Sequence, residues 1–182
     1  MNFREVILLI LLTFSLIVYI SCDKKEVKKY NSHVNVDLGC KKVNIPQPIS
    51  MKMYYDIVKY SKKYNIPKHI AFNIAYKETR YRGPFHFGYQ HNLTSSAGAV
   101  GPMQIKPSTA NYIHDEPITS HNLRNDVQLN IKISMKLLNI LYKKYGNWKI
   151  VCGCYNTGRP MVNEYALFCV NNKDYRKYWN QI

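Results

Sequence analysis

Three short segments of this chain carry side chains that could perform acid–base chemistry. Residues 75–79 read AYKET and contain one carboxyl group, that of Glu78. Further along the chain, residues 96–105 read SAGAVGPMQI and residues 154–158 read CYNTG. The amide and hydroxyl groups of these two segments can donate and accept hydrogen bonds. A carboxyl group with such neighbours can act first as a general acid and then as a general base.

Glu78 continues the apolar face of a predicted helix. Ile70 and Ile74 precede it at helical spacing, so the three residues fall on one stripe. An acid in this position lies either in the core or at the edge of a cleft, where burial disfavours its charged form. Taken alone, the segment also fits a surface glutamate that pairs with Arg80 or Arg82.

The periodicity of the apolar residues predicts helices and no run of strands, which places the chain in the all-α class. Ser50 is the predicted N-cap of the first helix. Asn125 and Asp126 cap the longest helix, which Gly146 ends. Residues 82–93 are rich in glycine, histidine and aromatic residues and are expected to form a loop. The predicted helices cover about 50–64, 67–81, a short helix from 107, 126–145, 148–155 and 174–179.

The three segments resemble the core motifs of the soluble lytic transglycosylase (SLT) domain, a goose-lysozyme-like family classed as glycoside hydrolase family 23. That family writes its motifs as Glu-Ser, Gly-Leu-Met-Gln and Ala-Tyr-Asn. In this chain they read Glu78-Thr79, Gly101-Pro102-Met103-Gln104 and Cys154-Tyr155-Asn156. The resemblance covers residues 66–158 and implies a lysozyme-like helical domain around a substrate groove.

The resemblance implies an enzyme that cleaves peptidoglycan glycan strands, with Glu78 as its single catalytic group. Glu78 donates a proton to the β-1,4 bond between N-acetylmuramic acid (MurNAc) and N-acetylglucosamine (GlcNAc). It then takes a proton from the C6 hydroxyl of the same MurNAc, which closes a 1,6-anhydro ring. The mechanism needs no metal and no cofactor.

Two alternatives stay open. One is a muramidase on the same fold that uses water and needs a second carboxylate. The nearest candidates for that group, Asp115 and Glu116, lie in a loop beside Pro117 and match no family position. The other alternative is a peptidoglycan-binding module without turnover.

The resemblance also implies residues that bind substrate. Gly98 and Gly101 are expected to let the main chain approach a sugar closely, and Met103 to pack against a sugar ring. Tyr155 is expected to form a hydrogen bond near the Glu78 carboxylate. Core packing is the alternative for Met103 and Tyr155. The expected substrate-binding residues are Thr79, Ser96, Gly98, Gly101, Met103, Gln104, Tyr155, Asn156 and Tyr178.

Four of these assignments are carried over by position. Ser96 is matched to the serine that precedes the family's Gly-Ala pair. Gln104 and Asn156 are matched to residues that orient an N-acetyl group or a neighbouring main chain. Tyr178 is matched loosely to a tyrosine of the family's last segment.

The N-terminal part of the chain has the pattern of a targeting segment. Residues 1–21 combine a short charged start with a largely apolar run, as in a secretory signal. Ile20-Ser21-Cys22 resembles the end of a bacterial lipoprotein signal, in which Cys22 is lipidated; an uncleaved anchor is the alternative. Residues 22–48 are expected to form a flexible tether, and residues 49–182 the catalytic domain. Either reading places that domain outside the cytoplasm, on the periplasmic or cell-surface side, tethered to a membrane.

The net charge of +15 favours anionic partners. The basic residues are scattered and form no nucleic-acid-binding motif, so nucleic acid is not expected to be a partner. The expected partners are peptidoglycan strands, the membrane through the N-terminal anchor, and cell-wall or secretion machinery. A surface on which lysines replace other polar residues, with no specific anionic ligand, is the alternative.

Overall fold

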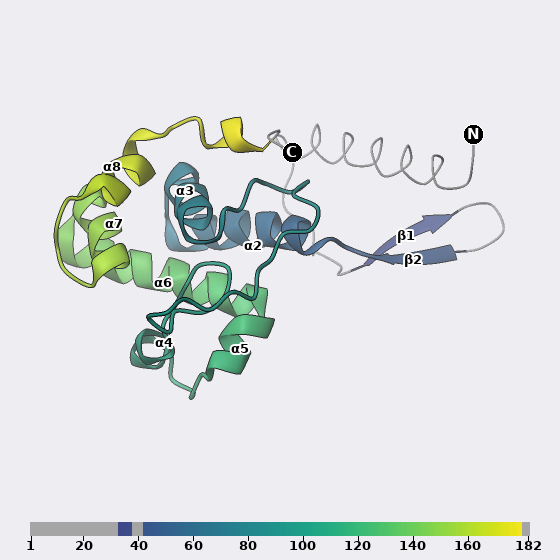
Figure 1. The fold of residues 1–182 in the computed structure, drawn as a ribbon, viewed down its shortest axis with the longest axis horizontal. Coiled ribbons are helices and arrows are strands. Elements are labelled where there is room, and N and C mark those ends of the chain that lie inside the picture. Colours follow the sequence, from purple (N-terminus) through teal and green to yellow (C-terminus); the bar gives the residue numbers. More distant parts are fainter. Residues whose placement is uncertain (1–32, 38–41, 180–182) are drawn as a thin grey trace. The chain divides into compact units, whose positions relative to one another are not determined.

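The computed structural model describes the main chain of residues 33–37 and 42–46 and the whole of residues 47–179 (Figure 1). Within these ranges, no helix has both the length and the hydropathy needed to cross a membrane. The predicted signal at 1–21 and Cys22 lie outside the described residues. The elements are β1 (His33–Asp37), β2 (Lys42–Pro46), α2 (Ile49–Tyr64), α3 (Lys68–Thr79), α4 (Pro107–Ile113), α5 (Ser120–Asn125), α6 (Val127–Tyr145), α7 (Trp148–Thr157), α8 (Glu164–Asn171) and the 3-10 turn η1 (Tyr175–Tyr178).

Strands β1 and β2 form an antiparallel hairpin, in a register that runs from His33 opposite Pro46 to Asp37 opposite Lys42. Both strands lie within residues 22–48, which are expected from the sequence to form a flexible tether. The two strand sequences, HVNVD and KVNIP, alternate apolar and polar residues, which is the pattern of a strand. From residue 49 onward the long elements are helices, and the predicted all-α, lysozyme-like class of the catalytic domain is confirmed.

The ends of the helices follow local capping chemistry. Helix α3 begins after Pro67 and ends at Arg80, which takes a left-handed conformation. The side chain of Asp126 accepts a hydrogen bond from the Leu129 main chain at the start of α6, and Gly146 ends that helix, as predicted. Ser50 was wrongly predicted as an N-cap, because α2 begins one residue earlier and the buried Ser50 hydroxyl donates instead to the Pro84 carbonyl at 2.8 Å.

Helix α6 is the centre of the helical domain. It packs against α2 on one side, against α4 and α5 on another, and against α7 near its C-terminal end (Figure 1). Its buried stripe meets the buried stripe of α2, which explains why both helices are amphipathic. The fully buried residues of these two helices include Met53, Ile57, Ile131, Met135 and Leu138.

Helices α3 and α8 are held together by a buried amide. Asn73 Nδ2 donates to the carbonyls of Cys169, at 3.0 Å, and of Asn172, at 2.7 Å. The neighbouring residue, Phe72, stacks on Tyr175 with ring centroids 4.9 Å apart, so the tail also covers α3. This packing sets the position of α8 relative to Glu78, which lies in the last turn of α3.

The segment from Tyr81 to Leu93 contains no helix, as predicted. It is anchored on the first turn of α2, because the Tyr81 hydroxyl donates to the Ser50 carbonyl at 2.7 Å. Tyr81 itself is buried, which fixes the path of the chain as it leaves α3.

Candidate active site

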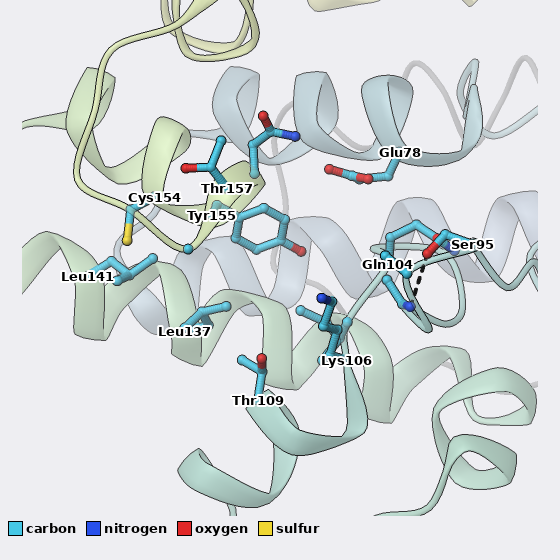
Figure 2. Close-up of a pocket in the computed structure, with 15 residues that line it drawn as sticks. Glu78, Ser95, Gln104, Lys106, Thr109, Leu137, Leu141, Cys154, Tyr155 and Thr157 are labelled. Carbon is cyan, nitrogen blue, oxygen red and sulfur yellow. Dashed lines mark hydrogen bonds between the residues drawn. The ribbon is translucent and has the colours of Figure 1, made fainter.

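A cavity of about 480 Å³ lies between α3, the loop that follows it, α4, α6 and α7 (Figure 2). One wall is apolar, formed by Leu137 and Leu141 of α6. The other walls carry polar groups. The lining residues are Glu78, Ser95, Ala97, Ala99, Gln104, Ile105, Lys106, Thr109, Leu137, Leu141, Cys154, Tyr155, Asn156, Thr157 and Gly158.

Glu78 enters this cavity from the last turn of α3, where the apolar stripe of Ile70 and Ile74 places it, as predicted. Burial raises the pKa of its carboxyl group above the ordinary value. A hydrogen bond from Tyr165 and the nearby charge of Lys77 act in the opposite direction and offset only part of that rise. A carboxyl group with a raised pKa holds its proton to a higher pH, which is what a general acid requires.

Tyr165 is the direct partner of the acid. Its hydroxyl donates a 2.5 Å hydrogen bond to Glu78 Oε1, which leaves the second carboxyl oxygen for a ligand in the cavity. The sequence prediction missed this residue because it did not identify helix α8. A signal was present: Asn163 precedes an apolar run, and its side chain caps the helix by accepting from the Ala166 main chain at 2.9 Å.

Tyr155 lines the cavity but does not hold Glu78. Its hydroxyl donates to the main-chain carbonyl of Met103 at 2.7 Å, so the expected hydrogen bond at the Glu78 carboxylate is made by Tyr165 instead. Met103 is 0% exposed and belongs to the core, so the expected packing of Met103 on a sugar ring was wrong. Tyr155 thus supports the loop beneath the cavity from α7.

Gln104 lies in the cavity wall at the end of a tight turn. The main chains of Val100 and Ile105 pair across this turn, at 2.9 and 3.1 Å. Gln104 has a φ of 50°, which is unusual for a residue with a side chain. Its side-chain amide donates to the carbonyls of Gly101, at 2.8 Å, and Leu93, at 3.2 Å. The Gln104 side chain therefore binds the main chain of its own loop, one of the two roles expected for it, and these bonds hold it in place at the cavity.

Asn130 of α6 fixes the inner side of the same turn. The side-chain amide donates to the carbonyls of Val100, at 2.8 Å, and Leu123, at 3.1 Å, and its oxygen accepts from the Met103 main chain at 3.0 Å. Gly101 passes directly over this amide, and a Cβ there would lie 2.4 Å from Asn130 Nδ2. The close approach expected at Gly101 is therefore to Asn130 within the protein.

The remaining glycine and serine positions differ from the expectation in detail. Gly98 has a φ of +76° and open space where a Cβ would stand, so its backbone conformation accounts for the glycine. Ser96 is exposed and does not line the cavity, whereas Ser95 does. The Ser95 hydroxyl accepts from the Ala99 main chain at 3.0 Å and so closes the turn through Gly98.

Thr79 is buried and joins α3 to the loop, and it does not line the cavity. Its hydroxyl lies 2.9 Å from the Pro102 carbonyl and 2.6 Å from the Tyr89 hydroxyl. Asn156 does line the cavity, as expected, and its side-chain oxygen accepts from Asn163 at 3.1 Å.

Tyr178 does not reach the cavity. Its ring stacks on that of Tyr76, with centroids 4.1 Å apart, and lies near Phe168. Tyr178, which was loosely matched to a cleft tyrosine, therefore lies away from the site. The tyrosine that contacts Glu78 is Tyr165.

Glu78 is the only carboxyl group among the described residues that line the cavity. Asp115 and Glu116 are exposed in the loop after α4 and do not line it. Asp56 is buried in α2, but it accepts from Lys52 at 2.7 Å and Gln128 at 3.2 Å. Across residues 47–179 no group of histidine, cysteine and acidic side chains could hold a metal ion.

Comparison with known proteins gives one family. The family model described as "Transglycosylase SLT domain" matches residues 56–177. No curated protein matches the chain.

Solved structures with a similar chain path include two lytic transglycosylases. The 70 kDa soluble lytic transglycosylase of Escherichia coli is 24% identical (TM-score 0.48), and an inactive mutant of the lytic transglycosylase Slt of Pseudomonas aeruginosa is 18% identical (TM-score 0.47). Each alignment covers 69% of this chain and 22% of the longer protein. A cellulase of Clostridium thermocellum is 16% identical (TM-score 0.45), over 70% of this chain and 73% of its own.

Proposed function

Because this chain belongs to the transglycosylase SLT domain family, we propose that it is a peptidoglycan lytic transglycosylase. The proposed reaction cleaves the β-1,4 bond between MurNAc and GlcNAc and leaves a 1,6-anhydroMurNAc end. The observation that carries the proposal is the setting of Glu78. Among the described residues it is the only carboxyl group that lines the cavity, burial raises its pKa, and Tyr165 binds one of its oxygens.

The proposed reaction proceeds in two proton transfers through Glu78. In the first, protonated Glu78 gives its proton to the glycosidic oxygen, and the bond from that oxygen to C1 of MurNAc breaks. In the second, the C6 hydroxyl oxygen of the same MurNAc bonds to C1, and its proton passes to the Glu78 carboxylate. The group returns to its starting form, and no water is consumed.

The arrangement of the cavity favours this reaction over hydrolysis. Inverting and retaining hydrolases both use two carboxyl groups that flank the bond. In the described part of the chain, the cavity offers one. A substrate that supplies its own hydroxyl nucleophile needs only the one group that Glu78 provides.

Mass spectrometry of muropeptides released from purified peptidoglycan tests the proposal. The full-length protein should release products that end in 1,6-anhydroMurNAc, and the Glu78→Gln variant should release none. A Glu116→Gln variant is the matched control, because this acid is exposed and lies outside the cavity. Products with a reducing MurNAc end would instead identify a muramidase. No release, with binding to peptidoglycan retained, would identify a binding module.

We further propose that residues 1–21 export the domain and that a membrane anchor, through lipidated Cys22 or an uncleaved segment, holds it near the wall. The apolar run that ends before Cys22 supports this proposal. Fractionation of expressing cells and the mass of the mature N-terminus test it. A full-length, unmodified protein in the cytoplasmic fraction would contradict export.

A further inference from the structure

Lys106 is a charged group at the cavity that the proposed mechanism does not use. It precedes the first turn of α4 and lines the cavity on the side across from Glu78 (Figure 2). Among the described residues that line the cavity, it is the only one with a positively charged side chain. Two polar residues that are close to Lys106 in sequence, Gln104 and Thr109, also line the cavity.

The charge of Lys106 has no acidic partner within the described residues. The ion pair found there joins Lys52 to Asp56 within α2, far from Lys106 in sequence. The lysine whose charge lowers the pKa of Glu78 is its neighbour in α3, Lys77. Lys106 is exposed, so its ammonium group is free to meet a ligand that enters the cavity.

A lysine at the wall of a cavity favours a ligand with a negative charge. The two sugars of peptidoglycan differ in this respect. GlcNAc is neutral, whereas MurNAc carries a lactyl ether on C3 that ends in a carboxylate or in a peptide with carboxylates of its own. Glycans built only from glucose or GlcNAc offer no such group.

We propose that Lys106 binds the carboxylate carried by the C3 substituent of a MurNAc residue in the cavity. This contact makes Lys106 a specificity-determining residue that favours peptidoglycan over neutral glycans. The inference rests on the proposed function for its substrate, and it adds the residue that recognises the acidic sugar. The carboxylate has two sources, the lactyl group itself or the attached peptide.

The size of the expected effect follows from the charge. Lys106 is exposed, so solvent screens its attraction to a carboxylate and the expected effect is modest. A loss of about tenfold in affinity corresponds to about 1.4 kcal/mol.

Binding is measured in the full-length protein that carries Glu78→Gln, so that turnover does not consume the ligand. Four glycan fragments of equal length serve as probes: peptide-free GlcNAc–MurNAc chains with free lactyl carboxylates, the same chains after conversion of those carboxylates to methylamides, peptide-bearing chains, and GlcNAc chains. The first and third probes distinguish the two sources of the carboxylate.

Three further substitutions are compared in this background. Lys106→Gln removes the charge, Lys106→Arg keeps it, and Lys149→Gln removes an exposed charge from α7 outside the cavity. Lys106→Gln should weaken binding of carboxylate-bearing chains about tenfold and leave the methylamide and GlcNAc chains unchanged. Lys106→Arg should retain most of the affinity, and Lys149→Gln all of it. Loss on the peptide-free acid alone assigns the lactyl carboxylate; loss on the peptide-bearing chain alone assigns the peptide.

Equal loss on charged and neutral probes, no loss on any probe, or no binding of any probe would each overturn the inference. The proposed function is tested separately, by the release of 1,6-anhydroMurNAc products from peptidoglycan by the protein with Glu78 intact. If those products form while Lys106→Gln binds all probes as before, the function stands and the inference fails. If binding depends on Lys106 but no products form, the inference stands and the function fails.

Discussion

The hydroxyl of Tyr165 and the carboxyl group of Glu78 are joined by a 2.5 Å hydrogen bond across 87 positions of sequence. This bond favours the charged form of the acid, while burial favours the neutral form, and burial has the larger effect on the pKa. The acid is therefore held in one orientation without losing its raised pKa. Both properties suit the role proposed for Glu78, in which it first releases a proton and then recovers it.

Tyr165→Phe should lower kcat/KM about tenfold to a hundredfold, because the carboxyl group loses the contact that orients it. Removal of a hydrogen bond to the charged form also raises the pKa of Glu78. The alkaline limb of the profile of kcat/KM against pH, where Glu78 loses its proton, should therefore move to higher pH. A limb that stays in place or moves to lower pH would contradict this role.

Tyr155→Phe is the matched tyrosine variant and should act mainly on stability. It leaves the carbonyl of Met103 without its 2.7 Å donor in a buried setting. We expect the free energy of unfolding to fall by about 1–3 kcal/mol, measured by urea denaturation. The alkaline limb should stay within the error of the native profile, in contrast to that of Tyr165→Phe.

Glu78→Gln should abolish turnover and stabilise the fold at neutral pH. Because the pKa of Glu78 is raised in the folded state, the unfolded chain loses this proton first as pH rises, and the native protein loses stability through that range. The variant has no such group. Its advantage should be absent below the ordinary carboxyl pKa of about 4.3, grow as the pH rises, and level off above the folded pKa.

The advantage should appear as a higher Tm of the variant than of the native protein, with a difference that grows as the pH rises. Thermal unfolding from pH 4 to pH 8 measures it. Glu116→Gln, at an exposed site, should show no comparable gain. If Glu78→Gln raises the Tm by the same amount at pH 4 and at pH 8, the carboxyl charge is not the cause of the gain.

Gly101→Ala and Gly98→Ala separate two reasons for glycine in one loop. Both positions have a φ near +80°, which costs an alanine about 1–2 kcal/mol. At Gly101 the new Cβ would also lie 2.5 Å from the Leu123 carbonyl and against the Asn130 amide, whereas Gly98 has open space. Gly101→Ala should therefore cost more than about 3 kcal/mol of stability. If both variants lose a similar amount of stability, the Asn130 side chain moves aside at little cost in free energy.

The sequence was sufficient to predict the helices that carry strong periodicity and clear caps, and with them the position of the acid. Glu78 lies at a cavity because its helix continues a buried stripe, and that stripe is a local property. The caps at Asp126 and Gly146 are local as well. These features needed no knowledge of tertiary contacts.

The partners of the acid could not be predicted in the same way. Which tyrosine reaches Glu78 depends on how α7 and α8 pack against α3, and residue type does not distinguish Tyr155 from Tyr165. Met103 likewise becomes a core residue only because α6 passes beneath its loop and Asn130 binds its main chain. The short helix α8 itself was overlooked because its sequence is apolar almost throughout.

The position of α8 late in the chain has a consequence for synthesis. Translation delivers Glu78 well before Glu164–Asn171, and until that helix docks through Asn73 the acid has neither its hydroxyl partner nor its cover. A nascent chain that has emerged as far as Gly158 contains every residue that lines the cavity but lacks the hydroxyl group that binds Glu78. Docking of α8 through Asn73 is therefore the step that completes the surroundings of Glu78.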